Sequence, residues 1–155
     1  MTSSLKVAVV TPEGAAFEGS ASSVVVPGHD GEVAFLRGHA PFVGAIGFGE
    51  LRVTTDDGAT RRWYLEGGVA QVLDDEVTVL ADGILPSEQV DAESAQKDLD
   101  EALASTPVTD DEFTARDNRL ASANARLRIA KNPARFLSLV DKRRFRDPEA
   151  RPRER

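Results

Sequence analysis

Residues 28–53 read GHDGEVAFLRGHAPFVGAIGFGELRV, and short apolar runs alternate in this stretch with turns that contain glycine. Runs at 33–36, 42–46 and 51–55 have the length of strands, and they are separated by Arg37-Gly38 and by the glycines at 47 and 49. No helical period joins one run to the next. The stretch therefore predicts several short strands in succession.

The same pattern extends in both directions from this stretch. Strand-like runs lie at 5–9, 24–26, 61–65, 69–73 and 77–81, and Asp56-Asp57-Gly58 is a typical hairpin turn between two strands. Trp63 and Tyr64 are neighbours on one predicted strand, so we expect one of them in the core and the other at the surface. Many short strands at close spacing indicate an antiparallel β-sandwich or barrel.

The second half of the chain has a different composition. Eleven of the twelve glycines lie at or before Gly68, the last is Gly83, and the sequence after Pro86 is rich in Ala, Leu, Asp and Arg. Glycine-free sequence of this kind predicts helix. A division at Pro86 predicts a β-sandwich domain over residues 1–86, an antiparallel helical hairpin over 87–132, and a partly disordered C-terminal extension over 133–155.

Both helices of the predicted hairpin have start and stop signals. Asp91 can cap the first helix, and Thr106-Pro107 ends it because the residue before a proline disfavours the α region. Thr109 and Glu112 form a capping box for the second helix, which Asn132-Pro133 ends. One thin apolar stripe lies on each helix: Ala95, Leu99, Ala102 and Leu103 on the first, and Phe113, Leu120, Ala123, Leu127 and Ala130 on the second. Stripes this thin predict that the hairpin needs a partner surface to be stable.

The chain is acidic overall, and its charge changes sign near the end. It has 26 acidic and 19 basic side chains, a formal net charge of −7, and this balance argues against general nucleic-acid binding. Residues 1–86 carry a net −7 and residues 132–155 a net +4, so the C-terminal extension is basic. The hydrophobic fraction of 41% is high enough for a packed core, and the apolar runs are too short for a membrane span or a signal peptide.

Few residues have the pattern of a catalytic or metal site. The chain has no cysteine, which excludes disulfides, thiolate metal sites and a cysteine nucleophile. His29 and His39 with Asp30 and Glu32 could supply nitrogen and oxygen ligands, but their spacing matches no metal motif. The serines lack a GxSxG elbow, and the glycines form neither GxGxxG nor a phosphate-binding loop. We therefore expect no catalytic residue, metal or cofactor, and a small β-barrel enzyme with a histidine and carboxylate site stays open as an alternative.

Three blocks of sequence, in one order, resemble a known family. They are Gly31-Glu32 before a short strand, the segment 38–42 reading GHAPF, and the segment 65–68 reading LEGG, which continues to VLAD at 79–82. With the helical hairpin behind them, these blocks resemble the epsilon subunit of the rotary proton-translocating (F-type) ATP synthase over residues 5–131. The resemblance implies a β-sandwich followed by two antiparallel helices, which agrees with the pattern of the residues.

The resemblance also implies a non-catalytic rotor subunit of the central stalk, without a cofactor, that supports proton-driven ATP synthesis. Such a subunit lies at the cytoplasmic face of a bacterial plasma membrane or in the organellar equivalent, and it associates with the membrane only through the complex. A free-standing adaptor with the same fold is a second alternative. The contacts that the family implies are Gly31 and Glu32 with the c-ring, and His39, Ala40, Pro41 and Phe42 with the gamma subunit.

This sequence departs from the family pattern at three positions. Arg37 stands where the family has proline, and Ala34 replaces a glycine. Family members that bind ATP in the hairpin carry a DxxRA-type motif, whereas here Asp91 is followed by Ser94 at the arginine position. Serine offers a phosphate neither a fixed charge nor forked donors, so we expect no nucleotide site.

Arg116, Arg119 and Arg126 lie beside or within the apolar stripe of the second predicted helix. An arginine buried against the sandwich is costly without a partner, so this face predicts contact with an acidic surface. In the family the hairpin can extend toward the catalytic head of alpha and beta subunits and restrain ATP hydrolysis. The resemblance therefore implies a regulatory helix, and we expect the basic extension over 133–155 to add electrostatic grip on an acidic partner.

Overall fold

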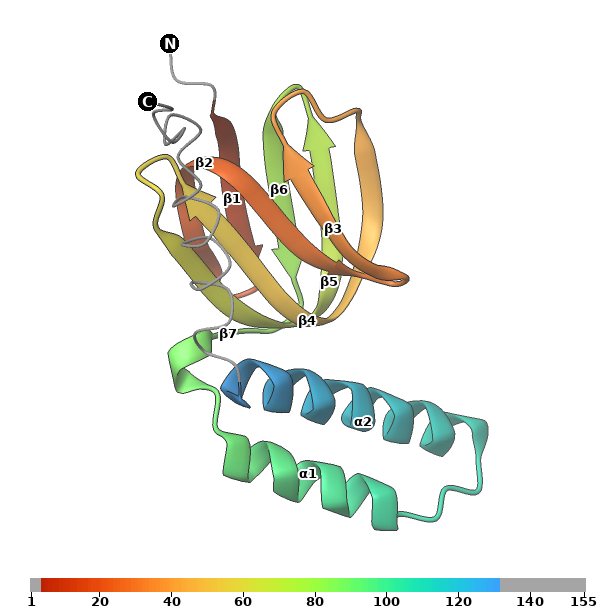
Figure 1. Ribbon diagram of the computed structural model, residues 1–155. Helices are drawn as coiled ribbons and strands as arrows, with labels where there is room; N and C mark the ends of the chain where they lie inside the picture. The colour runs from red at the N-terminus through yellow and green to blue at the C-terminus, as the bar shows by residue number, and fades with distance from the viewer. Residues whose placement is uncertain (1–3, 132–155) are drawn as a thin grey trace, which may run out of the picture.

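A computed structural model describes residues 4–131 of the chain (Figure 1). The predicted basic extension over 133–155 lies outside these residues. Within the described range the elements are β1 (Leu5–Thr11), β2 (Gly14–Gly28), β3 (Gly31–Leu36), β4 (Phe42–Thr55), β5 (Thr60–Leu73), β6 (Glu76–Ala81), β7 (Ile84–Pro86), the 3₁₀ turn η1 (Ser87–Gln89), α1 (Ala92–Ala104) and α2 (Asp110–Lys131).

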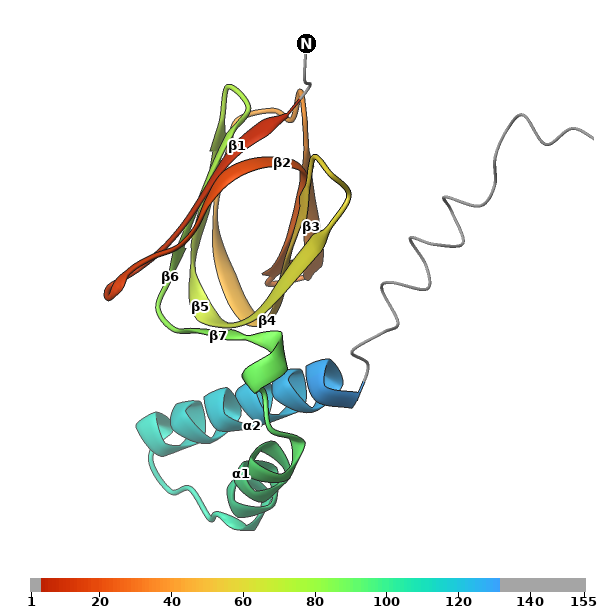
Figure 2. The same cartoon turned by 90° about the vertical axis from the view of Figure 1, so that its left-hand side faces the viewer.

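The strands form one sheet that closes on itself, as Figure 2 shows. Its order is β1-β6-β5-β4-β2-β3, and β1 also pairs with β2, so the ring runs through β1, β6, β5, β4 and β2. β1 is antiparallel to β2 but parallel to β6. β3 pairs with β2, and β7 pairs with β5. The prediction of a β-sandwich or barrel followed by two antiparallel helices is confirmed.

Alternate residues of the strands point into the ring and make its core. Val7 and Val9 of β1 lie opposite Val77 and Val79 of β6, and all four are buried. The other buried members of this core are Leu5, Phe17, Ala21, Val24, Val26, Phe35, Ile46, Leu51, Val53, Trp63, Leu65, Ala70, Val72 and Ala81. Full burial of a valine or leucine side chain contributes about 1.5–3 kcal/mol, so this cluster is the main source of stability.

Two long strands replace four of the predicted short ones. β4 continues through Gly47 and Gly49, and β5 through Gly67 and Gly68, so the strand ends predicted there are wrong. Gly67 and Gly68 have φ values of +86° and +140°, which favour glycine, and an added Cβ at Gly49 would lie 2.5 Å from Pro27 Cβ. At Gly68, whose φ is +140°, an added Cβ would lie 1.9 Å from the Leu80 carbonyl oxygen. The backbones of β5 and β6 therefore approach to a distance that only glycine allows.

The turn and cap signals of the sequence are found in the structure. The turn at 56–58 joins β4 to β5, and Asp91 accepts a backbone hydrogen bond that caps α1. The Glu112 N–H donates to Thr109 Oγ1 at 3.2 Å, while Glu112 Oε2 accepts from the Thr109 N–H at 3.1 Å, which is a complete capping box. Hydrogen bonds from the backbone N–H groups of Val108 and Thr109 lower the pKa of Glu112.

The helical hairpin lies across one end of the barrel, with α2 between α1 and the strands (Figures 1 and 2). Two faces of α2 are therefore buried, whereas the sequence predicted a single stripe. Leu127 lines a groove together with Leu99 of α1, and Ala125 and Ile129, on the opposite face, pack against Tyr64 of β5. The sandwich of the same chain supplies the partner surface that the thin stripes require.

Trp63 and Tyr64 are both buried, with 4% and 2% of their surfaces exposed, so the prediction that one of them lies at the surface is wrong. Trp63 points into the barrel, and α2 covers the outer face on which Tyr64 lies. The Tyr64 hydroxyl lies 2.5 Å from Ser122 Oγ of α2, and burial raises the pKa of Tyr64. This hydrogen bond ties the hairpin to the sheet.

The substitution Gly68→Ala tests the close approach of β5 and β6. We expect it to lower the free energy of unfolding by at least about 2 kcal/mol, because the new Cβ meets a backbone carbonyl and the residue keeps a positive φ. Urea unfolding of the full chain, followed by circular dichroism, measures the loss. Gly47→Ala is the matched control, because an added Cβ there meets no atom within 4 Å and φ lies outside the left-handed range. Equal stabilities of the two variants would contradict this account of Gly68.

The substitution Tyr64→Phe tests the link between α2 and the sheet. We expect faster amide hydrogen exchange across α2 and little change in the strands, because removal of a hydrogen bond worth about 1 kcal/mol weakens the docking of the hairpin. Thr114→Ala, which removes an exposed hydroxyl from the same helix, is the control. Unchanged exchange in Tyr64→Phe would show that Ala125 and Ile129 hold α2 in place without the hydrogen bond.

Candidate functional site

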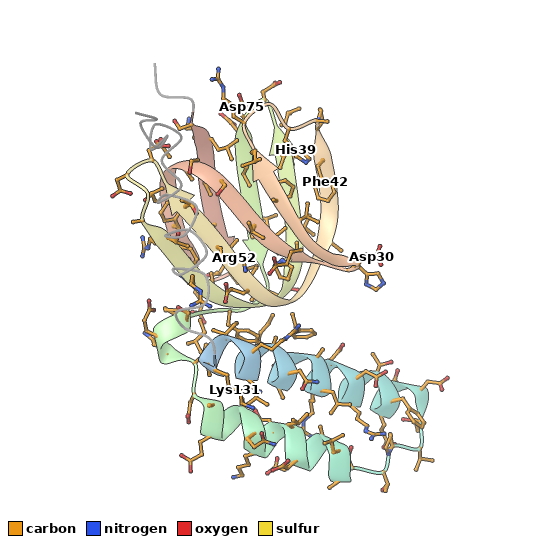
Figure 3. The ribbon with its side chains drawn as sticks, in the orientation of Figure 1. Asp30, His39, Phe42, Arg52, Asp75 and Lys131 are labelled. Carbon is orange, nitrogen blue, oxygen red and sulfur yellow. The ribbon has the colours of Figure 1, made fainter. Side chains whose placement is uncertain are left out.

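The block 39–42, the predicted gamma-subunit contact, lies in and after the turn between β3 and β4, at the end of the barrel away from the helices (Figure 3). Asp75, in the turn between β5 and β6, holds this loop. Its Oδ1 accepts from the Gly38 N–H at 2.7 Å, and its Oδ2 lies 3.8 Å from Arg37 Nε. Arg37, at the position where the resemblance implies a proline, therefore pairs with Asp75 of the adjacent turn. The β3–β4 loop is thus held by a residue of the β5–β6 turn.

Three rings pack together under this loop. The ring centroid of Phe35, which is fully buried, lies 5.2 Å from that of His39 and 5.4 Å from that of Phe42. His39 Nδ1 lies 2.7 Å from the Ala40 carbonyl oxygen, which can only accept, so Nδ1 carries a proton and donates it. Ala40 and Pro41 are exposed, while His39 and Phe42 are half-buried. His39 and Phe42 thus shape the loop, and Ala40 and Pro41 present its surface.

Beside the loop lies an apolar surface that was not predicted. The outer apolar patch, as we call it, consists of Val43, Val69, Leu73 and Leu80, which are 71%, 41%, 48% and 51% exposed. It spans β4, β5 and β6 on the outside of the ring, where Val69 lies opposite Leu80. Val43 follows the block 39–42 directly, so the patch continues the surface of the loop. Gln71 lies among these side chains, opposite Val43. Exposed apolar side chains gathered on one face of a sheet are typical of an interaction surface.

A signal for this surface was present in the sequence. Residues 69–73 read VAQVL, with apolar side chains on both faces of the strand. An antiparallel strand with one solvated face alternates instead between apolar and polar residues. The inner residues of this segment, Ala70 and Val72, are buried in the core, which leaves Val69 and Leu73 for the outer face.

Gly31 and Glu32, the predicted c-ring contacts, lie at the tip of the β2–β3 hairpin, at the other end of β3 from the block 39–42. Both are exposed, and the φ of Gly31, +128°, favours glycine. The two carboxylate oxygens of Glu32 accept hydrogen bonds from Arg52 Nη1 and Nη2 at 2.9 and 2.8 Å. Glu32 is therefore held in a bidentate ion pair with the neighbouring part of the sheet.

The ion pair of Glu32 continues into a chain of alternating charges along β3, β4 and β5. Arg52 Nη1 also donates to Glu50 at 3.2 Å, and Glu50 accepts from Arg62 Nη2 at 2.5 Å. Burial alone would lower the pKa of Arg52, but the hydrogen bonds and charges of Glu32 and Glu50 outweigh it and raise the pKa. The guanidinium of Arg52 is thus charged at every physiological pH and fixes Glu32.

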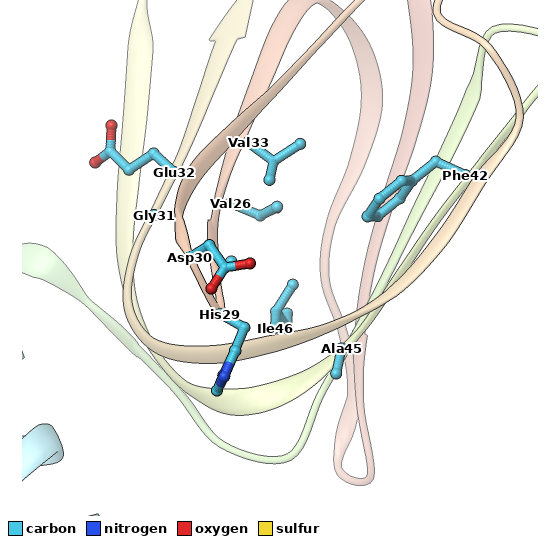
Figure 4. Close-up of a pocket in the computed structure, with 10 residues that line it drawn as sticks. Val26, His29, Asp30, Gly31, Glu32, Val33, Phe42, Ala45 and Ile46 are labelled. Atoms are coloured by element: carbon cyan, nitrogen blue, oxygen red, sulfur yellow. The ribbon is translucent and has the colours of Figure 1, made fainter.

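A pocket of about 300 Å³ opens beside the hairpin tip (Figure 4). Figure 4 shows the Asp30 carboxylate directed toward the apolar side chains of this pocket and the Glu32 carboxylate directed away from them. Its apolar side chains come from Val26, Val33, Phe42, Ala45 and Ile46, its polar ones from His29 and Asp30, and Glu32 borders it with the carboxylate directed away. The arrangement fits a side chain that is apolar along its length and polar at its end.

The three arginines of α2 that were predicted to be regulatory, Arg116, Arg119 and Arg126, all contact α1. Arg116 Nε donates to the Ala102 carbonyl oxygen at 3.1 Å, Arg119 Nη2 donates to Glu101 at 3.3 Å, and Arg126 Nη2 donates to Asp98 at 2.6 Å. They were predicted to contact an acidic surface. In this structure the acidic partners of Arg119 and Arg126 lie on α1 of the same chain. Ser94, at the arginine position of the ATP-binding motif, is exposed on the first turn of α1.

The structure does not bring the two histidines of the metal hypothesis together. His29 and His39 lie in turns at opposite ends of β3. Within residues 4–131, no group of three or more histidine, cysteine, aspartate or glutamate side chains is placed to hold a metal ion. The helices of the same range are too short or too polar to cross a membrane.

Comparison with known proteins identifies the family. A family model described as the ATP synthase delta/epsilon chain, beta-sandwich domain, matches residues 4–87. The ATP synthase epsilon chain of Rhodopirellula baltica is 37% identical over 128 residues, which cover 83% of this chain and 99% of that protein. The epsilon chain of a Synechococcus species is 36% identical over 135 residues, covering 83% and 98%. The chloroplastic epsilon chain of Guillardia theta is 32% identical over 129 residues, covering 80% and 95%.

Two solved assemblies contain chains of the same fold. A chain of the mitochondrial ATP synthase of Euglena gracilis, in an assembly of OSCP, F1 and c-ring, superposes with a TM-score of 0.73 at 21% identity, covering 81% of this chain and 80% of that one. A chain of the central stalk and c-ring of the Tetrahymena thermophila mitochondrial ATP synthase superposes with a TM-score of 0.66 at 12% identity, covering 81% and 95%. Since the family model spans the whole barrel and relatives above 30% identity cover about four fifths of the sequence, this chain belongs to the family of ATP synthase epsilon chains, which are non-catalytic subunits of that complex.

Proposed function

We propose that this chain is a rotor subunit in the central stalk of a proton-translocating ATP synthase, where it links the gamma subunit to the c-ring and supports ATP synthesis. The observation that carries the proposal is the outer apolar patch beside the block 39–42, a surface suited to a permanent protein partner. The site of action is the cytoplasmic face of a bacterial plasma membrane, or the organellar equivalent, and the complex provides the link to the membrane. The subunit needs no cofactor for this role.

The gamma subunit is the proposed partner of the loop and the patch. Ala40 and Pro41 are exposed at the tip of a loop that Asp75 holds from the next turn, and Val43 begins the patch beside them. An anchored loop loses little conformational entropy on binding, and the apolar side chains of the patch gain from burial. The two features together give a stiff, apolar contact that needs no reactive group.

The c-ring is the proposed partner of the β2–β3 tip with Gly31 and Glu32. This tip and the block 39–42 lie at the two ends of β3, whose Phe35 is fully buried in the core. β3 is hydrogen-bonded to β2 along its whole length, and this pairing keeps the separation of the two contacts constant. Such rigidity suits an adaptor that turns with both of its partners.

The helical hairpin is the proposed regulatory element, acting on the alpha and beta subunits of the catalytic head. In the folded hairpin Arg116 and Arg126 are half-buried against α1, so separation of the helices would free them for an acidic surface of the head, whereas Arg119 is already exposed. The contacts of α2 with the barrel and with α1 then compete with the contacts that restrain ATP hydrolysis. The balance between the two sets decides how strongly the subunit inhibits.

The substitution Val43→Asp tests the gamma contact. We expect it to weaken capture of the gamma subunit and the c-ring from solubilised membranes by at least about tenfold, because a charge would be buried in an apolar interface. Val108→Asp, at a residue that is 83% exposed in the connection between the helices, is the matched control. Recovery of the gamma subunit by Val43→Asp at the wild-type level would contradict the proposed contact. A wild-type chain that captures only soluble partners would favour a free-standing adaptor.

A nucleotide titration tests the expectation for the hairpin. We expect no micromolar ATP binding by the full chain in titration calorimetry, because Ser94 cannot supply the charge-assisted, forked hydrogen bonds that arginine gives a phosphate. Ser94→Arg is the informative variant, since it restores the residue that the family motif has at this position. Micromolar binding by the wild-type chain would overturn the expectation and would direct attention to the arginines of α2.

A further inference from the structure

The β2–β3 tip carries two neighbouring carboxylates, and among the described residues only that of Glu32 is engaged. Both oxygens of Glu32 accept from Arg52, whose side chain is 15% exposed and which also contacts Glu50. Asp30 is exposed, and within residues 4–131 no hydrogen bond or ion pair reaches its carboxylate. The negative charge of Glu32 is thus compensated from inside the sheet, whereas that of Asp30 is available to a partner.

The surroundings of Asp30 select the kind of partner group. Its carboxylate is directed toward a pocket of about 300 Å³ with Val26, Val33 and Ile46 among its apolar side chains, as Figure 4 shows. Lysine and arginine have an apolar stem and a charged end, and such side chains bury the stem along apolar surface while the charge meets a carboxylate. A basic side chain therefore matches both parts of the site, and the net −7 of residues 1–86 favours its approach.

We infer that Asp30, and not Glu32, makes the charged contact with the c-ring: it receives a basic side chain from a loop of the ring, with the stem of that side chain in the pocket beside it. Glu32 is a positioning residue, which fixes the hairpin tip through Arg52. The inference rests on the proposed function, and it moves the contact from the carboxylate that the family resemblance implies to its neighbour.

The experiment compares two affinities of the full chain, one for the complex of gamma subunit and c-ring and one for the gamma subunit alone. The ratio of these two affinities measures the contribution of the ring. It is measured for the wild type, Asp30→Asn, Glu32→Gln and the control Asp56→Asn, which removes an equal charge from the exposed β4–β5 turn. Each ratio is determined between about 0.05 M and about 0.3 M salt, since an exposed charge contact weakens as screening increases.

We expect Asp30→Asn to lower the ratio about fivefold at low salt and to remove its salt dependence, with an unchanged melting temperature. Glu32→Gln is expected to lower the melting temperature while the ratio keeps its salt dependence, and Asp56→Asn is expected to match the wild type. An unchanged ratio in Asp30→Asn, or a loss of salt dependence in Glu32→Gln, would overturn the inference. A wild-type ratio of one would instead overturn the proposed contact with the ring, and the inference with it.

Discussion

The pairing of β1 with two strands at once is the contact on which the rest of the structure depends. β1 is antiparallel to β2 and parallel to β6, and this double pairing turns an open sheet into a ring. Val7 and Val9 face Val77 and Val79 inside the ring, so the closure also completes the core. Closure satisfies the backbone groups of strands that would otherwise be edges and leaves them unavailable for aggregation.

Once the ring is closed, its surface has distinct parts that suit different partners. The anchored loop with the block 39–42 and the outer apolar patch adjoin at one end, and the helices cover the other. The charged β2–β3 tip is joined to the loop by β3, which contributes the buried ring of Phe35 to the core. The apolar and the charged surface therefore belong to one rigid body. A protein that couples a soluble rotor part to a membrane ring needs this combination more than it needs a reactive group.

The hairpin is held more weakly than the strands are held to one another. Within residues 4–131, its contact with the barrel includes an apolar cluster of Tyr64, Ala125 and Ile129, against which Phe48 and Leu85 pack, and the hydrogen bond between Tyr64 and Ser122. A contact of this size is among the least stable in the structure, so its local opening requires the least free energy. The ion pairs of Arg119 and Arg126 join α2 to α1 rather than to the barrel. The same charged groups thus serve the closed hairpin and would be available to a partner after it opens.

The amino-acid sequence by itself determined the features that depend on near neighbours. The turn at 56–58, the cap at Asp91 and the capping box of Thr109 and Glu112 each rely on hydrogen bonds within a few residues, so their residue types are sufficient to predict them. Strand content in the first half and helix content in the second followed from composition and periodicity, and the order of three sequence blocks was sufficient to indicate the family.

Only the tertiary structure decided the features that depend on distant segments. Gly67 and Gly68 lie inside β5 and are not strand ends, and the backbone of β6 passes close beside Gly68. Tyr64 is buried because α2, some sixty residues later in the sequence, covers it. Within the described part of the chain Glu32 is engaged and Asp30 is not, because Arg52, on another strand, pairs with Glu32 alone of the two. Hydrogen-bond geometry between near neighbours is encoded in a few adjacent residue types. The pairing of segments far apart depends on the free energy of the whole packed ring, which no single stretch of sequence contains.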